Sequence, residues 1–170
     1  MRTVALIDGH DVLTGGLHSV ADARRFWIGV ASRDHVNVAV TGAFIQLNHG
    51  QRVPVRRLKA GDGLIMYSPR TVYPDGEPLQ AFTAIGTVVT GEVYQVEVTP
   101  DFRPYRLNVQ FVPSTQAQIK PVIPHLSFIK SKSNWGAALR FGLLQVPRSD
   151  FTLIAERMGA VSAVWTTHVE

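Results

Sequence analysis

The chain of 170 residues contains no cysteine, and this absence excludes several classes of site. Without a thiol there is no disulfide framework, no thiolate zinc site and no cysteine nucleophile. Long hydrophobic runs are missing as well, since none approaches the roughly 20 residues that cross a bilayer. The amino-terminal segment MRTVALIDGHD has acidic residues where a secretory signal would have its apolar stretch. We therefore expect a cytoplasmic protein that does not associate with membranes.

The motifs of several large enzyme classes are also absent. The sequence has no GxxxxGK(S/T), GxGxxG, GxSxG or HExxH pattern, and its scattered histidines have no pair at helical metal-ligand spacing. The cluster at 8–11 could bind a metal, although a solvated loop is the favoured interpretation. Ser32, Asp34 and His35 suggest a catalytic triad, but neighbours in sequence do not supply an oriented base, and helix capping is favoured. We expect no catalytic residue, no metal and no cofactor.

Acidic residues are missing from the whole stretch 102–149, which carries several basic ones. A second basic group precedes Asp62. If both groups fold onto one side, they form a surface that attracts phosphate and loses affinity with salt. A solvated basic face without a partner is the alternative. The residues predicted to bind phosphate are Arg52, Arg56, Arg57, Lys130, Lys132 and Arg140.

The hydrophobic pattern predicts about six short strands. Segments 93–98 and 106–111 alternate apolar and polar residues, as half-buried antiparallel strands do. The apolar runs 26–31, 64–67 and 82–89 predict buried strands. Further short segments add a strand at 44–47 and a solvent-facing connection at 53–59.

Short helices are predicted around this sheet, at 32–40, 121–126, 135–141 and 150–158. Ser32, Asn134 and Ser149 are suited to cap helix starts, and Gly142 is suited to a helix end. The predicted class is therefore α+β, a compact barrel-like sheet with small peripheral helices. Residues 1–24 are interpreted as an extension, 25–159 as the domain and 160–170 as a tail.

Several aromatic residues stand beside small or polar ones, a mixture that suits a pocket for a flipped base. Such a base needs flat apolar walls for stacking and a few polar groups for its edge. The alternative is that a tryptophan within a strand belongs to the core. The aromatic residues in question are Phe26, Trp27, Tyr67, Phe128 and Trp135.

Long segments of the chain resemble the EVE-domain family, part of the PUA-like superfamily that also holds the YTH domains. They run in order from about 25 to 159, with family-like spacing. The resemblance implies a PUA-like β-barrel with short flanking helices and a pocket at one end. The matching segments are FWIGVASRDHV (26–36), GAFIQLNHG (42–50), LKAGDGLIMYSP (58–69), QAFTAIGTV (80–88), VYQVEV (93–98), FRPYRLNVQF (102–111), KPVIPHLSFIKSKSNWGAALRFG (120–142) and DFTLIAERMG (150–159).

The resemblance also implies a function. EVE proteins are thought to flip out modified bases, chiefly 5-methylcytosine or 5-hydroxymethylcytosine in DNA, and other PUA-like members bind RNA. We therefore expect a non-enzymatic reader of a modified base. An RNA or tRNA module and a small-molecule or nucleotide-processing enzyme are the alternatives. The resemblance implies a base pocket formed by Trp27, Gly29, Val30, Ala31, Ser32, Tyr67, Ser68, Pro69, Leu126, Ser127, Phe128, Ile129 and Trp135, with Ser32 as the polar contact to the base.

Overall fold

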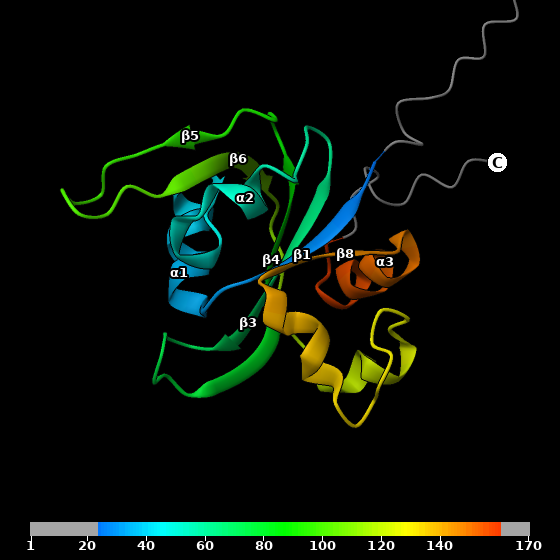
Figure 1. Ribbon diagram of the computed structural model, residues 1–170. Coiled ribbons are helices and arrows are strands. Elements are labelled where there is room, and N and C mark those ends of the chain that lie inside the picture. Colours follow the sequence, from blue (N-terminus) through cyan, green and yellow to red (C-terminus); the bar gives the residue numbers. More distant parts are fainter. Residues whose placement is uncertain (1–23, 161–170) are drawn as a thin grey trace, which may run out of the picture.

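The computed structural model describes residues 24–160, which form a curled, mixed β-sheet surrounded by short helices. Figure 1 shows the sheet between helices on its two sides. The extension, the cluster at 8–11 and nearly all of the tail lie outside the described residues. The strands are β1 (Phe26–Val30), β2 (Phe44–Ile45), β3 (Gly63–Arg70), β4 (Pro78–Val88), β5 (Tyr94–Gln95), β6 (Tyr105–Phe111), β7 (Ala117–Gln118) and β8 (Leu143–Val146).

The strands follow the order β2-β6-β4-β3-β1-β8, while β5 pairs with β6 and β7 pairs with β4. β1 runs parallel to β3, and the other pairings among the described residues are antiparallel. The predicted fold class is therefore confirmed.

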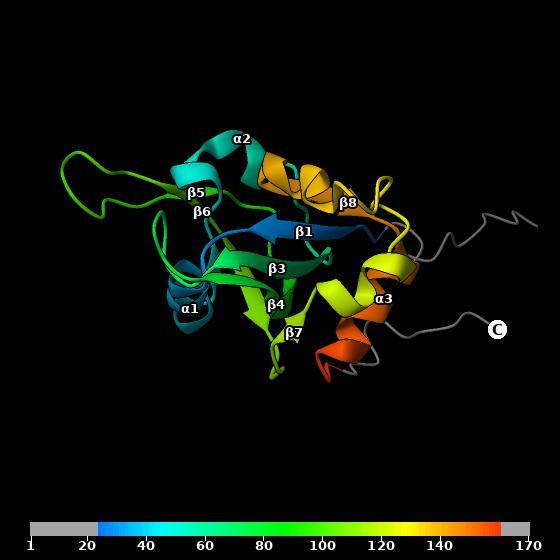
Figure 2. The same ribbon diagram turned by 90° about the horizontal axis from the view of Figure 1, so that it is seen from below.

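Within residues 24–160, three α-helices and three 3-10 helices surround the sheet. Figures 1 and 2 place α1 and α3 on opposite sides of the central strands. No helix within residues 24–160 has the length and apolar character that crossing a membrane requires. The helices are α1 (Arg33–Gly42), α2 (Arg52–Val55), α3 (Arg148–Arg157), η2 (Asn48–Gly50), η3 (Lys120–His125) and η4 (Trp135–Phe141).

β1 is buried on both faces, because alternate side chains enter two different core clusters. Phe26 and Ile28 join the first cluster, which includes Phe151 from α3. Trp27 joins the second, which includes Val55 from α2 and residues of β6. A strand covered on both faces has a continuous apolar run instead of alternation, and this is the pattern from which it was predicted.

Two predictions of local structure are wrong. The supposed solvent-facing connection at 53–59 contains part of α2, and Val55 and Leu58 are buried in the second cluster. The strand predicted at 93–98 is reduced to the two residues of β5. Both errors arise because periodicity does not show whether a partner surface is available to a short segment.

The predicted helix caps are partly correct. Gly142 adopts the left-handed conformation (φ 77°) that ends η4. Ser32 stands at the N-cap position of α1, but its hydroxyl donates to the Asp34 carboxylate and not to a helix N–H. Pro147, and not Ser149, precedes α3.

β5, the start of β6 and the loop 96–104 between them form an arm that projects from the body of the molecule (Figures 1 and 2). At its root, Gly50 has φ 83° and packs so closely on Pro104 that an added Cβ would stand 2.3 Å from the Pro104 Cβ. Only glycine combines this conformation with this approach. The contact therefore fixes where the arm leaves the sheet.

Candidate functional site

A cavity of about 570 Å³ lies beside the end of β1. This volume is within the range of about 300–1,000 Å³ typical of small-molecule sites. The wall combines α1, the end of β1, β2, β6, the arm, η2 and η4. The lining residues are Val30, Ala31, Ser32, His35, Val36, Val38, Ala39, Phe44, Ile45, Gln46, Asn48, His49, Met66, Pro69, Tyr73, Val98, Phe102, Arg106, Leu139, Arg140 and Gly142.

Four of the predicted base-pocket residues line this cavity, namely Val30, Ala31, Ser32 and Pro69. They lie together because β1 and β3 are parallel neighbours, so that both strands end at the same edge of the sheet. The hollow beside Ser32 that the base-pocket hypothesis requires is therefore present.

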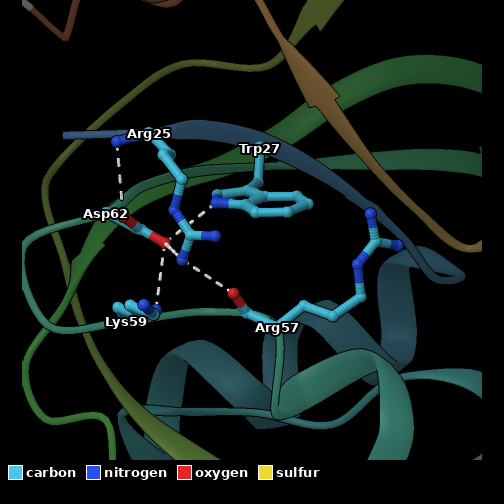
Figure 3. A network of polar contacts seen from close by, with 5 residues as sticks. All are labelled: Arg25, Trp27, Arg57, Lys59 and Asp62. Carbon is cyan, nitrogen blue, oxygen red and sulfur yellow. Dashed lines mark hydrogen bonds and ion pairs between the residues drawn. The ribbon is translucent and has the colours of Figure 1, made fainter. Parts of the chain in front are cut away.

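Trp27 does not line the cavity, contrary to the prediction. Its side chain is only 1% exposed, and its Nε1 donates to Asp62 Oδ2 at 2.9 Å. The guanidinium carbons of Arg25 and Arg57 each lie 5.0 Å from the centroid of its ring (Figure 3). The indole belongs to the core, with its polar edge satisfied by a buried carboxylate.

The other predicted residues of β1 and β3 are also packed in the interior. Tyr67 meets Phe82 edge-on, with 5.8 Å between ring centroids, and burial raises the pKa of its hydroxyl to about 12. The buried Ser68 hydroxyl shares a 2.8 Å hydrogen bond with that of Thr83. Gly29 is confined by Met66, whose Sδ would stand 3.0 Å from an added Cβ. These residues support the wall without forming it.

The remaining predicted pocket residues, 126–129 and Trp135, pack against the first core cluster and α3. Leu126 and Ile129 are buried in that cluster, while Phe128 and Trp135 pack against it. Ser127 Oγ and the Phe128 N–H each donate to Asp150 Oδ2 at 2.9 Å. The segment is thereby tied to the first turn of α3, and none of its residues lines the cavity.

The aromatic walls come from residues that the sequence prediction missed. Phe44 is on β2, Tyr73 is in the loop between β3 and β4, and Phe102 is on the arm. Tyr73 is 60% exposed and meets His49 edge-on, with 5.5 Å between ring centroids. The available signal was an aromatic residue within a polar loop, where no core explains it.

Ser32, which lines the cavity, donates a hydrogen bond to the Asp34 carboxylate. Burial raises the pKa of Asp34, but hydrogen bonds from the Ser32 hydroxyl and the His35 backbone lower it more, leaving it below its usual value. A lowered pKa makes the Asp34 carboxylate a weaker base than an ordinary aspartate. Among residues 24–160, no histidine nitrogen is hydrogen-bonded to Ser32. The pair lies at the start of α1, where Asp34 places a negative charge in the first turn of the helix.

The predicted phosphate-binding residues do not form one surface. α2 packs on the second core cluster and the segment before Lys130 packs on the first, so Lys130 and the basic residues around α2 lie on different faces of the sheet. Lys132 Nζ donates to the carbonyls of Leu126 and Ile129 at 2.8 and 2.9 Å, which makes it an anchor of its own loop. Arg140 is exposed and lines the cavity.

The remaining basic residues of the first group surround α2. Arg52 and Arg56 are exposed, and the Arg52 guanidinium lies 5.9 Å from the ring centroid of Tyr105. Arg57 is exposed beside Trp27. Within the described part of the chain, no group of three histidine, cysteine, aspartate or glutamate side chains is placed to hold a metal.

Comparison with known proteins identifies the family. Residues 25–157 match the family described as EVE domain. A UPF0310 protein of Mycobacterium avium is 49% identical over 132 residues, covering 78% of this chain and 96% of that protein. The UPF0310 protein YdcG of Bacillus subtilis is 40% identical over 134 residues, covering 79% of this chain and 92% of that protein.

A solved structure agrees with the architecture. A protein from Agrobacterium tumefaciens matches with a TM-score of 0.50 at 11% identity, covering 81% of this chain and 96% of that one. At this identity the likeness concerns the fold alone. The chain therefore belongs to the EVE domain family.

Proposed function

We propose that this protein is a non-enzymatic nucleic-acid-binding module that reads a modified base in DNA by flipping it into the cavity beside Ser32. The EVE family, generally one of binding modules, suggests nucleic-acid binding. The observation that carries the finer proposal is a cavity of about 570 Å³ beside the end of β1, whose mostly apolar lining includes Phe44, Tyr73 and Phe102.

The walls are suited to hold a planar base. Phe44, Tyr73 and Phe102 supply aromatic surface, while Ser32 and Asn48 supply hydrogen-bonding groups for the base edge. Stacking of a base on aromatic side chains contributes about 1–3 kcal/mol, and removing that base from the stack of a duplex costs a few kcal/mol. The two nearly cancel, so contacts with phosphates must supply most of the affinity and the cavity the selectivity.

The apolar part of the lining favours a base that carries an added methyl group. Val30, Ala31 and Met66 present hydrocarbon and thioether atoms to the cavity. An additional methyl group in a hydrophobic pocket is worth about 1–3 kcal/mol, or roughly 10- to 200-fold. A 5-methylcytosine is therefore expected to bind better than cytosine by about this factor.

A binding panel tests the proposal. Duplexes and RNAs that differ in one modified base are titrated at fixed salt with the wild type, Tyr73→Ala and Phe102→Ala. Phe141→Ala is the matched control, because Phe141 is 76% exposed and does not line the cavity. We expect a preference for a modified duplex of about tenfold or more that the two cavity variants reduce and the control retains.

The alternative outcomes separate the hypotheses. A preference for RNA over every duplex would favour an RNA-binding module instead. Absence of binding to any nucleic acid, or an equal effect of all three substitutions, would contradict the proposal.

A further inference from the structure

Arg106 is a cation that the fold holds in the wall of the cavity. In the β2–β6 register Ile45 faces Leu107, so that Gln46 and Arg106 lie opposite one another on the other face of the pair. Arg106 Nε donates to Gln46 Oε1 at 3.1 Å, and its guanidinium carbon lies 3.9 Å from the ring centroid of Phe44. These contacts fix the plane of the guanidinium group.

The terminal nitrogens of Arg106 are left without partners. Within residues 24–160, neither Nη1 nor Nη2 donates a hydrogen bond to another residue, and no carboxylate pairs with the group. The lining of the cavity includes no aspartate or glutamate. By contrast, Arg103 on the same arm pairs with Glu97 at 2.9 Å. Arg106 is therefore a partly buried, oriented cation without a counter-charge.

Such an arrangement has a cost unless a ligand compensates it. A charge removed from water is unfavourable without a partner, and a planar guanidinium is suited to bidentate binding of phosphate. Arg140, His35 and His49 line the same cavity, so the electrostatic character of the wall is positive or neutral throughout. The cavity is thus suited to a ligand that is aromatic at one part and anionic at another.

We propose that Arg106 binds a phosphate of the nucleotide whose base occupies the cavity, through its two terminal nitrogens. The ligand is then a nucleotide with its phosphate and not a bare base. This inference rests on the proposed function and deepens it by naming the second chemical group that the site recognises. The phosphate belongs either to a polymer or to a free mononucleotide, and the experiment distinguishes these sources.

The first arm uses small ligands. Cytidine, 5-methylcytidine and their 5′-monophosphates, in ribo and deoxy forms, are titrated by calorimetry or NMR. We expect the monophosphates to bind the wild type at least about tenfold more tightly than the nucleosides, as charge-assisted hydrogen bonds do. Arg106→Gln should abolish this ratio and retain nucleoside binding, while Arg106→Lys should restore part of it. Arg103→Gln, on the same arm but outside the cavity, should leave it unchanged.

The second arm uses the polymer. A duplex with one modified base carries a neutral methylphosphonate in place of the phosphate beside that base. We expect the replacement to weaken binding of the wild type about tenfold and to leave binding of Arg106→Gln unaffected, because the contact is already lost. Melting temperatures of both Arg106 variants are measured alongside, and Arg106→Lys replaces Arg106→Gln if the latter fails to fold.

The outcomes of this inference and of the proposed function are separable. Equal binding of nucleosides and monophosphates, together with no methylphosphonate effect on the wild type, overturns the role of Arg106 even if a modified duplex is preferred. A phosphate effect that persists unchanged in both Arg106 variants also overturns it. An Arg106-dependent phosphate effect on mononucleotides, without binding of any polymer, supports the inference and contradicts the proposed function.

Discussion

A guanidinium group lies over an aromatic ring near each of the two ends of β1, but the surroundings of the two pairs differ. At the start of the strand, Arg25 lies over Trp27 and also donates to Asp62 Oδ2 at 2.7 Å. Near its end, Arg106 lies over Phe44 in the wall of a cavity, without a carboxylate. The first set of groups is satisfied by the protein itself, and the second leaves donors for a ligand.

The difference shows that residue type alone does not identify a binding site. Asp62 is 2% exposed and accepts hydrogen bonds from two nitrogens of Arg25, from Trp27 Nε1 and from the Lys59 N–H (Figure 3). This network ties the start of β1 to the turn before β3. An aromatic and cationic cluster is structural where its polar groups are already paired, and a candidate site where they are not.

Removal of the Asp62 carboxylate should have the largest effect of the changes considered. Asp62→Ala leaves the Trp27 and Lys59 N–H groups without acceptors, and we expect a loss of about 3–5 kcal/mol in the free energy of unfolding. Chemical denaturation measures it, with Asp101→Ala on the exposed arm as control. A loss no greater than that of Asp101→Ala would contradict the structural role of the Asp62 network.

Trp27→Phe separates the two ends of β1 most directly. The substitution removes the Nε1 donor to Asp62 and part of the buried ring volume, so we expect a loss of about 1–3 kcal/mol in stability. The preference for a modified base should stay as in the wild type, because Trp27 does not line the cavity. A variant that is as stable as the wild type but no longer prefers the modified base would show that Trp27 contributes to base recognition.

Tyr73→Ala should show the reverse. Because Tyr73 is largely exposed, we expect its loss to change stability by less than about 0.5 kcal/mol and to weaken binding of the modified duplex by about 1 kcal/mol. Melting curves and duplex titrations on the same preparation measure both, with Phe141→Ala beside them. Equal binding of the modified duplex by Tyr73→Ala and Phe141→Ala would show that Tyr73 does not contact the base.

The smallest expected effect concerns Asp34, which accepts a hydrogen bond from Ser32. Its pKa is lowered in the folded state, so the ionised form contributes stability above the usual pKa of 3.8, and this is lost as pH falls through the lower folded-state value. Asp34→Asn should therefore be slightly less stable than the wild type near neutral pH, and the difference should shrink in acid. A difference in melting temperature that is constant with pH would contradict this assignment.

Much of the fold could be predicted from the sequence. The apolar runs and alternation identified β1, β3, β4 and β6, and Gly142 marked the end of η4. β8 was missed although it pairs with β1, because LLQV lies directly after a predicted helix and is too short to show a period. β7 was also missed, because a strand of two residues is too short to show a period.

The candidate site could be predicted only in part. Val30–Ser32 and Pro69 were found through the family resemblance. They line one cavity because the parallel strands β1 and β3 end at the same edge of the sheet. Trp27 and Tyr67 were assigned to the pocket as aromatic residues beside small or polar ones and through the family resemblance. Both faces of their strands are apolar, so the sequence does not show which side chain meets a hollow.

The sequence by itself determined the family, the succession of the main strands along the chain and the absence of thiol chemistry, since these depend on composition and on residues close together in the chain. Only the tertiary structure decided which aromatic residues surround a cavity and which cation lacks a carboxylate. The physical reason is that Phe44, Tyr73, Phe102 and Arg106 come from segments far apart in the sequence, and their proximity depends on strand register and on the arm. Whether a charge is paired is likewise a property of distances in space and not of neighbours in the chain.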